Sequence, residues 1–443
     1  MHDDLATAID DLFPQMRNDL EDLVRIPSVS LTSPDEVRRS ATATATLLDG
    51  AGLSGVRLLE VDGAHPAVFG EIPAPDGAPT VLLYAHHDVQ PPGDLAAWDS
   101  DPFEPVERDG RLYGRGSSDD KSGIVTHLGA IRAHDGRPPV GVKVFVEGEE
   151  ETGSDHLAEF LSRYGADLAA DAVVVADSGN WSTGQPALTT SLRGLVDCVV
   201  EVRTLEHGVH SGEYGGAFPD ALTTLMRICA TLHDEHGEVA VPGLVRGDAD
   251  PLDLTEEELR AEAGAVPGVE LIGSGSLTGR RWRKPAIAVL AVDAPPVDEA
   301  INQLVASARA KVSMRLAPGD DPDRAMDALV THIESVVPWG ARVTITPGGK
   351  GEPYELETTG PAYEAFRTGM REAWGVPAVD IGVGGSIPMV AALAEAYPDA
   401  SILLTGAADR LSRPHGPNES VDLGELRRAA LAEAIALRVL ANG

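Results

Sequence analysis

The sequence predicts an α/β fold in which a mostly parallel sheet is flanked by helices and interrupted by a smaller α+β domain. Two observations predict this fold. Over roughly the first 190 residues, short apolar runs alternate with amphipathic helical segments, which is typical of a parallel sheet. From about residue 191 the order changes to strand, helix, strand, strand, helix, strand, which is the split ferredoxin-like arrangement.

The first region begins with two helices and continues with strands. Apolar residues recur at helical spacing from Leu5 to Leu23 before Pro27 stops the first helix, and a second helix over residues 37–48 ends at glycines. Strands are expected where apolar runs are too short for a helix, over residues 80–85, 140–146 and 172–176. A helix around residues 124–131 lies between the first two of these strands.

The inserted region has its own order of elements. We expect its strand, helix, two strands, helix and strand over residues 195–202, 217–233, 286–292, 308–316, 322–337 and 342–345. The first pattern then resumes, with a helix, a strand and a helix over residues 361–374, 401–404 and 421–440. The predicted boundaries are therefore residues 1–190 and 349–443 for the two parts of the main domain, and 191–348 for the inserted domain.

The composition argues against two classes of partner. Acidic residues outnumber basic ones 70 to 35, which gives a formal net charge of −35. Such a surface repels phosphate groups, so we expect no nucleic-acid and no membrane partner. Cys198 and Cys229 lack a metal-binding spacing and are expected to be free thiols in a reducing compartment. Because the first residues are acidic and no apolar run approaches the ~18 residues of a membrane span, we expect a soluble, cytoplasmic protein.

Side chains able to bind a metal ion follow the predicted strands of the main domain. They are His86 and Asp88, then Glu150 and Glu151, then Asp177, and finally His415 in a loop. In open parallel sheets, ligands bind outside the carboxyl ends of the strands, so we expect these side chains to meet at one edge. Each has a simpler explanation when taken singly, since a histidine there is usually only hydrogen-bonded, an acidic run is usually solvated, and Asp119 or Asp120 could cap a helix.

The spacing of these residues favours a hydrolytic site with two metal ions. His86 and Asp88 point the same way on an extended strand, so Asp88 can orient the His86 imidazole, whereas His87 faces the other way. Of the adjacent Glu150 and Glu151, one can bind metal while the other stays free as a base. Two histidines and three carboxylates suit two Zn²⁺ ions, with Mn²⁺ or Co²⁺ as alternatives.

Eight segments, in this order, resemble the motifs of the co-catalytic zinc metallopeptidase family. They are YAHHDVQPP (84–92), GRGSSDDKSG (114–123), EGEEETGS (147–154), VVVADSGNW (173–181), GVHSGEYGG (208–216), KVSMRLAPGDDP (311–322), GGSIP (384–388) and RPHGPNES (413–420). The family includes carnosine-type dipeptidases, acetylornithine and succinyl-diaminopimelate deacylases, aminoacylases and related carboxypeptidases. The segments HDVQP, DDK, HSGEYGG and GGSIP are most similar to the dipeptidases.

The resemblance implies roles for residues of the main domain, and a fold like that of the zinc peptidases. The implied metal ligands are, for one ion, His86, Asp119 and Asp177 and, for the other, Asp119, Glu151 and His415. Asp119 would bridge the two ions, Glu150 would be the general base, and Asp88 would orient His86. Relatives also tend to have a cis peptide bond between Asp119 and Asp120.

The resemblance also implies that the inserted domain is a lid and dimerisation domain, and hence that the protein is a homodimer. His210 would stabilise the oxyanion in a neighbouring subunit's active site, and Arg315 would bind the terminal carboxylate of the substrate. The other expected substrate-binding residues are Gly385, Ser386 and Asn302. Ser386 is not expected to be a nucleophile, because GGSIP lacks the G-x-S-x-G elbow of serine hydrolases. Three features depart from the family pattern: Gly382-Val383 replaces a common Arg-Glu pair of the dipeptidases, the segment at Asn302 matches only loosely, and the segment 347–353 lacks a histidine that some relatives carry.

We therefore expect a metal-dependent hydrolase that cleaves the amide bond of dipeptides or similar small substrates with a free carboxylate. Two metal ions would activate a water, and Glu150 would accept its proton. An N-acyl-amino-acid deacylase is the alternative, because it applies the same chemistry to an acyl-amino-acid substrate. A carboxypeptidase or aminopeptidase acting on longer peptides comes next. A metal-binding protein without catalysis is disfavoured, because it has no use for a free base beside a metal ligand.

Overall fold

A computed structural model describes residues 2–356, 358–385 and 388–442 of the protein. The chain divides into two compact units. The first consists of Met1–Thr190, Leu356–Ile381 and Pro388–Gly443, and the second consists of Ser191–Glu355 with Gly382–Ile387. The second unit thus runs further along the chain than the predicted boundary at residue 348, and it includes a short later segment.

Most strands of the first unit belong to one sheet, which has nine strands in all. In spatial order the strands are β1 (Ser54–Leu59), β2 (Ala67–Ile72), β6 (Gly141–Glu147), β3 (Thr80–His86), β7 (Ala172–Val175), β17 (Ser401–Leu404), β8 (Ala187–Leu192) and β15 (Tyr354–Glu355), and β16 (Val379–Val383) pairs with β8. β3 runs parallel to β6 and β7, and β7 runs parallel to β17. The strands on either side, β2 and β8, pair with this group in the antiparallel sense.

The centre of this sheet confirms the predicted parallel arrangement. Buried strands of parallel sheets are covered on both faces and therefore read as continuous apolar runs. Residues 81–85 of β3 and 173–175 of β7 are such runs, and all of them are buried. The carboxyl ends of β6, β3, β7 and β17 consequently lie at one edge of the sheet.

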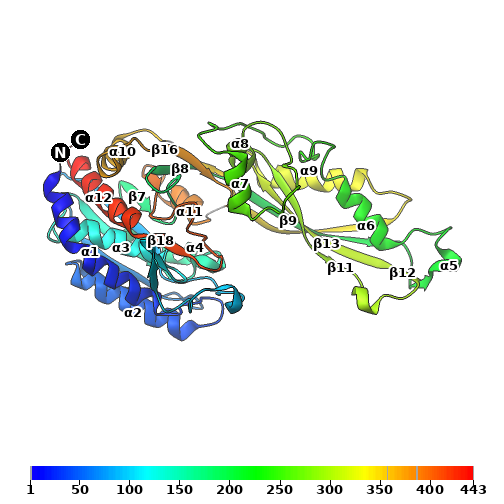
Figure 1. The fold of residues 1–443 in the computed structure, drawn as a ribbon, viewed down its shortest axis with the longest axis horizontal. Coiled ribbons are helices and arrows are strands. Elements are labelled where there is room, and N and C mark those ends of the chain that lie inside the picture. The colour runs from blue at the N-terminus through cyan, green and yellow to red at the C-terminus, as the bar shows by residue number, and fades with distance from the viewer. Residues whose placement is uncertain (1, 357, 386–387, 443) are drawn as a thin grey trace. The chain divides into compact units, whose positions relative to one another are not determined.

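The helices of the first unit flank this sheet. They are α1 (Asp3–Val24), α2 (Pro34–Gly50), α3 (Lys121–Arg132), α4 (Leu157–Leu168), α10 (Pro361–Trp374), α11 (Pro388–Ala396) and α12 (Leu423–Leu440). Figure 1 shows α1, α3 and α12 packed side by side, so elements from both ends of the sequence share one layer. Ile9 of α1, Leu128 of α3 and Leu437 of α12 belong to the same buried apolar cluster as Val144 of β6.

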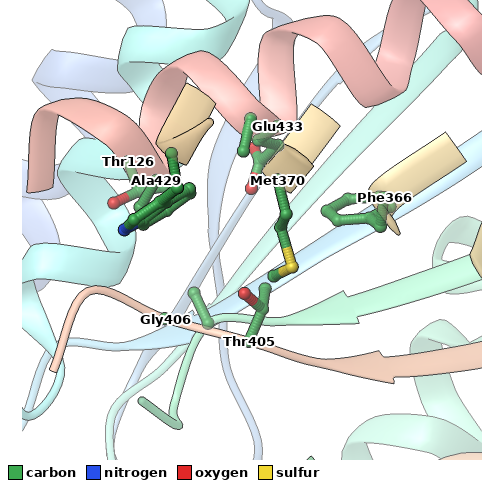
Figure 2. Close-up of a pocket in the computed structure, with 10 residues that line it drawn as sticks. Thr126, Phe366, Met370, Thr405, Gly406, Ala429 and Glu433 are labelled. Atoms are coloured by element: carbon green, nitrogen blue, oxygen red, sulfur yellow. The ribbon is translucent and has the colours of Figure 1, made fainter. Parts of the chain in front are cut away.

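A small cavity of about 10 Å³ lies between α3, α10, α12 and the residues that follow β17. Figure 2 shows its lining, in which Thr126, Thr405 and Glu433 supply oxygen atoms among mostly apolar neighbours. This volume suits about one water molecule.

Beside this cavity, the His127 side chain connects several elements. Its Nδ1 lies 2.9 Å from Glu433, and its Nε2 lies 2.9 Å from the carbonyl oxygen of Tyr84. The buried imidazole of His127 therefore connects α12 and α3 to strand β3.

The second unit contains a four-stranded antiparallel sheet packed against two helices. In spatial order its strands are β11 (Ala286–Asp293), β13 (Ser307–Leu316), β9 (Gly194–Arg203) and β14 (Arg342–Gly351). With α6 (Ala221–Ala230) and α9 (Pro322–Ser335), the order along the chain is β9-α6-β11-β13-α9-β14, which is the predicted split arrangement. Val200 and Met314 of the sheet share an apolar cluster with Leu225 of α6 and Leu329 of α9.

Smaller elements complete both units. The second unit also has α5 (Ser211–Tyr214), α7 (Glu256–Ala263), α8 (Leu277–Trp282) and the paired strands β10 (Val209–His210) and β12 (Gln303–Leu304). In the first unit, β4 (Val106–Arg108), β5 (Arg111–Tyr113) and β18 (Ser420–Asp422) form a three-stranded sheet. Among the described helices, none combines the length and the apolar character needed to cross a bilayer.

Candidate metal centre

The five predicted metal-binding residues lie together at the carboxyl edge of the parallel strands. His86 is the last residue of β3, and Asp177 comes shortly after β7. Glu151 lies in a short helical turn, Glu150–Thr152, that follows β6. Asp119 lies in the turns before α3, and His415 lies in the loop between β17 and β18. The sheet therefore gathers side chains that are distant in the sequence.

Asp119 lies between the two histidines. Its Oδ1 is 3.0 Å from Nε2 of His86, and its Oδ2 is 3.0 Å from Nε2 of His415. The two oxygens thus face different histidines, which is the geometry required of a carboxylate that bridges two ions. The peptide bond between Asp119 and Asp120 is cis, as the resemblance implied. Asp120 itself caps α3 by accepting a hydrogen bond from the backbone N–H of Gly123 at 3.2 Å.

The remaining predicted ligands divide between two ends of the candidate centre. At one end, Oδ1 of Asp177 is 3.9 Å from Nε2 of His86, whose side chain is fully buried. At the other, Oε2 of Glu151 is 3.1 Å from Nε2 of His415, whose side chain is 58 % exposed. We call the group of His86, Asp177 and Oδ1 of Asp119 the buried end, and the group of His415, Glu151 and Oδ2 of Asp119 the exposed end.

The donor set fits divalent metal ions. Ligand atoms of His86, Asp119 and Glu151 all lie within 4.8 Å of one another, and so do those of His86, Glu150 and Asp177. Imidazole nitrogens and carboxylate oxygens are the donors that Zn²⁺, Mn²⁺ and Co²⁺ accept in proteins. Both neighbouring glutamates, Glu150 and Glu151, therefore face the centre.

Asp88 supports the His86 imidazole from behind. Nδ1 of His86 lies 3.1 Å from the backbone oxygen of Asp88 and 3.4 Å from its Oδ1. A proton on Nδ1 can thus be held by Asp88, which leaves Nε2 free to bind a metal ion. The other carboxylate oxygen of Asp88 accepts a hydrogen bond from the backbone N–H of Glu151 at 3.1 Å. The buried Asp88 therefore connects the segments that carry both residues.

The electrostatics of the centre favour a bound cation. Burial raises the pKa of Glu150 to about 7, and the nearby carboxylates of Asp119 and Glu151 act in the same direction. Burial also raises the pKa of Asp177 well above its ordinary value, again reinforced by Asp119. Buried carboxylates that crowd one another disfavour ionisation unless positive charge compensates them. Divalent ions would supply that charge.

His87 has a structural role. Its Nε2 lies 2.9 Å from the backbone oxygen of Pro66, and burial lowers its pKa to about 4. The ring is fully buried and neutral at ordinary pH, as expected from its position on the opposite face of β3 from His86.

Two fully buried charged residues beside the centre were not identified from the sequence. Arg115 precedes Asp119 by four positions, and Glu419 follows His415 by four. Their side chains form an ion pair at 2.6 Å and are 1 % and 0 % exposed. Charged residues in a turn-rich segment are normally solvated, so their burial has no signal in composition or periodicity.

The other predicted site residues that the structure describes lie in the second unit. His210 is exposed on β10 opposite Gln303, and the backbone oxygen of Asn302 accepts a hydrogen bond from Ser211 at 3.1 Å, so His210 and Asn302 are near neighbours. Arg315 is partly buried on β13. Gly385 lies in the turn that follows β16, and Ser386 lies outside the described residues. The substrate-binding roles of these residues stay predictions.

Comparison with known proteins identifies the family. The sequence matches Peptidase family M20/M25/M40 over residues 82–438. It is 36 % identical over 409 residues to the cysteinylglycine-S-conjugate dipeptidase of Corynebacterium striatum, covering 90 % of this chain and 89 % of that protein. It is 28 % identical over 380 residues to the Beta-Ala-His dipeptidase of Rattus norvegicus, covering 81 % of this chain and 76 % of that protein.

Solved structures show the same fold. The dipeptidase Dug1p of Saccharomyces cerevisiae has a TM-score of 0.83 at 23 % identity, covering 99 % of this chain and 98 % of that chain. Human carnosine dipeptidase 1 has a TM-score of 0.82, also at 23 % identity, with the same coverage. The resemblance inferred from the motifs is thus confirmed, and the match over residues 82–438 includes every predicted metal ligand. The chain therefore belongs to the peptidase family M20/M25/M40 and is a metallopeptidase.

Proposed function

We propose that this metallopeptidase is a dipeptidase that hydrolyses the amide bond of dipeptides or similar small substrates with a free carboxylate. The observation that carries the proposal is the position of Asp119, which lies 3.0 Å from each of two histidines through separate oxygens, with Glu150 beside them. Relatives named for the hydrolysis of Cys-Gly conjugates and of β-Ala-His support a dipeptide substrate.

The proposed centre binds two divalent ions, most simply Zn²⁺, with Mn²⁺ or Co²⁺ as alternatives. His86, Asp119 and Asp177 would hold one ion, and Asp119, Glu151 and His415 would hold the other. When bound, the ions polarise the scissile carbonyl and lower the pKa of water from 15.7 to about 7.

The other acidic residues of the centre have separate roles in this proposal. Glu150 accepts a proton from the attacking water and returns it to the leaving amine as the amide bond breaks. Asp88 keeps the His86 imidazole in the tautomer that presents Nε2, consistent with its 3.4 Å distance from Nδ1. Neither role requires Glu150 or Asp88 to bind metal.

We also propose roles for residues of the second unit, on the basis of the motif resemblance. The guanidinium of Arg315 would bind the free carboxylate of the substrate in a bidentate manner, which selects substrates with a nearby C-terminus. His210 would stabilise the oxyanion formed at the carbonyl. Gly385, Ser386 and Asn302 would contact the substrate.

The role of His210 requires a homodimer, which we propose to form through the second unit. β11 is an edge strand of its sheet and exposes Val289, Leu290 and Val292. An exposed apolar edge strand is a surface on which a second chain can pair. Sedimentation velocity tests this, since a monomer of full activity would contradict the proposed role of His210. The free thiols of Cys198 and Cys229 are consistent with the proposed cytoplasmic location.

A substrate panel after metal removal and add-back tests the proposed activity. The purified protein would be depleted by a chelator, reloaded with Zn²⁺, Mn²⁺ or Co²⁺, and assayed on dipeptides, including Cys-Gly and β-Ala-His. N-acetyl and N-succinyl amino acids test the deacylase alternative, and tripeptides test a carboxypeptidase or aminopeptidase. We expect metal-dependent hydrolysis of dipeptides. Preferential hydrolysis of acyl-amino acids would replace the dipeptidase proposal with the alternative, and no hydrolysis by the metal-loaded protein would contradict both.

A further inference from the structure

Glu419, in the same loop as His415, accepts hydrogen bonds through both carboxylate oxygens. Its Oε1 accepts from the backbone N–H groups of Ser118 at 2.9 Å and Asp119 at 3.0 Å, and from the Ser118 hydroxyl at 3.0 Å. Its Oε2 accepts from Nη1 of Arg115 at 2.6 Å and from the backbone N–H of Gly116 at 3.0 Å. All five donors belong to residues 115–119, the segment that ends at the bridging Asp119.

This segment depends on partners outside regular secondary structure. Residues 115–120 form turns before α3 rather than a helix or a strand, and buried backbone N–H groups need acceptors. Glu419 accepts from three of these N–H groups through its side chain, and its backbone oxygen accepts from Gly114 at 3.0 Å. Glu419 therefore fixes the path of the chain that leads to Asp119.

Arg115 extends this connection to one further segment and makes a second contact with the loop of Glu419. Its Nη2 donates to the backbone oxygen of Pro91 at 3.3 Å and to that of Gly416 at 3.4 Å. Pro91 follows the segment of His86 and Asp88, and Gly416 follows His415 directly. The buried pair of Arg115 and Glu419, which we call the brace, thus joins three segments that each carry a predicted metal ligand.

The exposed end needs such support more than the buried end does. The backbone of His415 has a φ of 60°, and Arg413 and Asn418 in the same loop have φ values of 53° and 59°. Residues other than glycine hold this left-handed conformation only where their surroundings impose it. Because the His415 side chain is 58 % exposed, packing around the ring cannot be what fixes its position. The contacts of Gly416 and Glu419 with the segment of Arg115 provide the constraint.

We propose that the brace is a positioning element that sets the distance between Asp119 and His415 and thereby the affinity of the exposed end for its metal ion. The proposal rests on the proposed function in that it takes these residues to bind metal. It assigns no contact between the brace and the substrate. The buried end, where β3 places His86, should be much less sensitive to the brace.

The substitution Glu419→Gln tests this inference with little change in side-chain size. Whichever way the amide is oriented, its NH₂ group faces at least two of the donors now bound by the carboxylate, and the charge that compensates Arg115 is lost. The metal-free protein would be titrated with Co²⁺ by calorimetry, with the visible absorption of Co²⁺ recorded to report the coordination of each ion.

We expect two binding events in the wild-type protein. In Glu419→Gln the weaker event should lose about 10- to 100-fold in affinity, the range typical for removal of a group that holds a ligand in place, while the tighter event stays close to wild type. The absorption of the second Co²⁺ should change as well. Equal affinities for both ions in variant and wild type would overturn the proposal, and so would an equal loss at both ends.

Two further variants separate positioning from general destabilisation. Glu425→Gln is the matched control, because the buried carboxylate of Glu425 also accepts hydrogen bonds from an arginine, a backbone N–H and side chains, namely Arg428, Gly184, Asn180 and Trp374. It should leave both binding events unchanged, and an equal loss of affinity for the second ion in this control would overturn the proposal.

Ser118→Ala removes a single donor to Glu419, so it remains folded even if Glu419→Gln does not. Ser118→Ala should lower the affinity for the second ion by a smaller factor than Glu419→Gln does, and an unchanged affinity would count against the proposed role of the brace.

The same titration distinguishes failure of this inference from failure of the proposed function. A wild-type protein that binds two ions but hydrolyses no dipeptide would overturn the proposed function and leave the brace intact. Binding of fewer than two ions by the wild type would overturn the proposed role of the brace, because there would be no second ion whose affinity the brace could set.

Discussion

The buried and exposed ends of the candidate centre are held in different ways. His86 ends a central strand, and its ring is fully buried between Asp88 and Asp119. His415 lies in a loop with left-handed backbone, and most of its side chain is exposed. The sheet therefore places one histidine, whereas a few buried polar contacts place the other.

The difference predicts unequal sensitivity to substitution. A strand position is fixed by many hydrogen bonds and apolar contacts at once, so that losing a single contact moves it little. A loop position that depends on the brace of Arg115 and Glu419 has few redundant contacts. Substitutions near the buried end should therefore lower turnover or the free energy of unfolding. Substitutions near the exposed end should mainly lower the affinity for one metal ion.

The largest effect on turnover is expected from Glu150→Gln. A carboxylate oxygen of Glu150 lies within 4.8 Å of the ligand atoms of His86 and Asp177 at the buried end. In the proposed mechanism Glu150 transfers the proton. Loss of a general base costs typically 10²- to 10⁴-fold, so kcat should fall by about that factor while both ions remain bound. Steady-state kinetics together with metal analysis of the same sample measure this. Near-normal turnover with a full metal content would refute the role of Glu150.

The next largest effect is the contrast between His86→Ala and His415→Ala in the metal-free protein. His86→Ala leaves a buried cavity and removes the partner of Asp88 and Asp119, so the free energy of unfolding should fall by about 2–4 kcal/mol. His415→Ala removes a largely exposed imidazole that pairs with Asp119 and Glu151, and the loss of such a solvent-accessible cation typically costs about 1 kcal/mol or less. Urea denaturation with chelator present measures both values. Equal destabilisation would show that the two ends are held alike.

The sequence predicts the buried end well because apolar runs specify parallel strands. The runs at 80–85, 140–146 and 172–176 correspond to β3, β6 and β7, and the residues that follow them reach one edge of the sheet. The ends of helices were predicted less well, because they depend on local capping contacts. Helix α6 begins after its N-cap Asp220 rather than at residue 217, because Pro219 and the hydrogen bond from the backbone N–H of Thr223 to Asp220 fix its start.

The supports of the exposed end could not be predicted in this way. Arg115 and Glu419 have the same appearance in the sequence as solvated charges in turns, and only the folded chain brings them together and buries them. Strand β1 was also missed, because only one of its six residues is buried and its apolar signal is weak. Patterns report which residues are apolar, whereas buried polar networks depend on contacts between distant segments.

Metal removal provides a direct comparison of the two ends. A chelator in excess should remove the two ions in two separable kinetic phases, because the His415 side chain is 58 % exposed whereas that of His86 is fully buried. His415→Ala should abolish the fast phase and leave the slow one. The release of Co²⁺ is followed by its visible absorption. A single phase in the wild type would contradict the distinction between the ends.

The smallest effect should come from Asn418, which holds the far side of the His415 loop. Its side chain accepts a hydrogen bond from the backbone N–H of Asp99 at 2.9 Å and donates to the backbone oxygen of Ala97 at 3.3 Å. Asn418→Gly loses both bonds but accommodates the φ of 59°, whereas Asn418→Ala loses them and also strains the backbone. Two partly exposed hydrogen bonds contribute about 1 kcal/mol, so Asn418→Gly should weaken the second ion only about fivefold, and Asn418→Ala somewhat more. Calorimetric titration resolves the order of the two variants. If Asn418→Gly weakened that ion as much as Glu419→Gln does, the loop as a whole rather than the brace would hold His415, and the exposed end would have to be described as one cooperative segment.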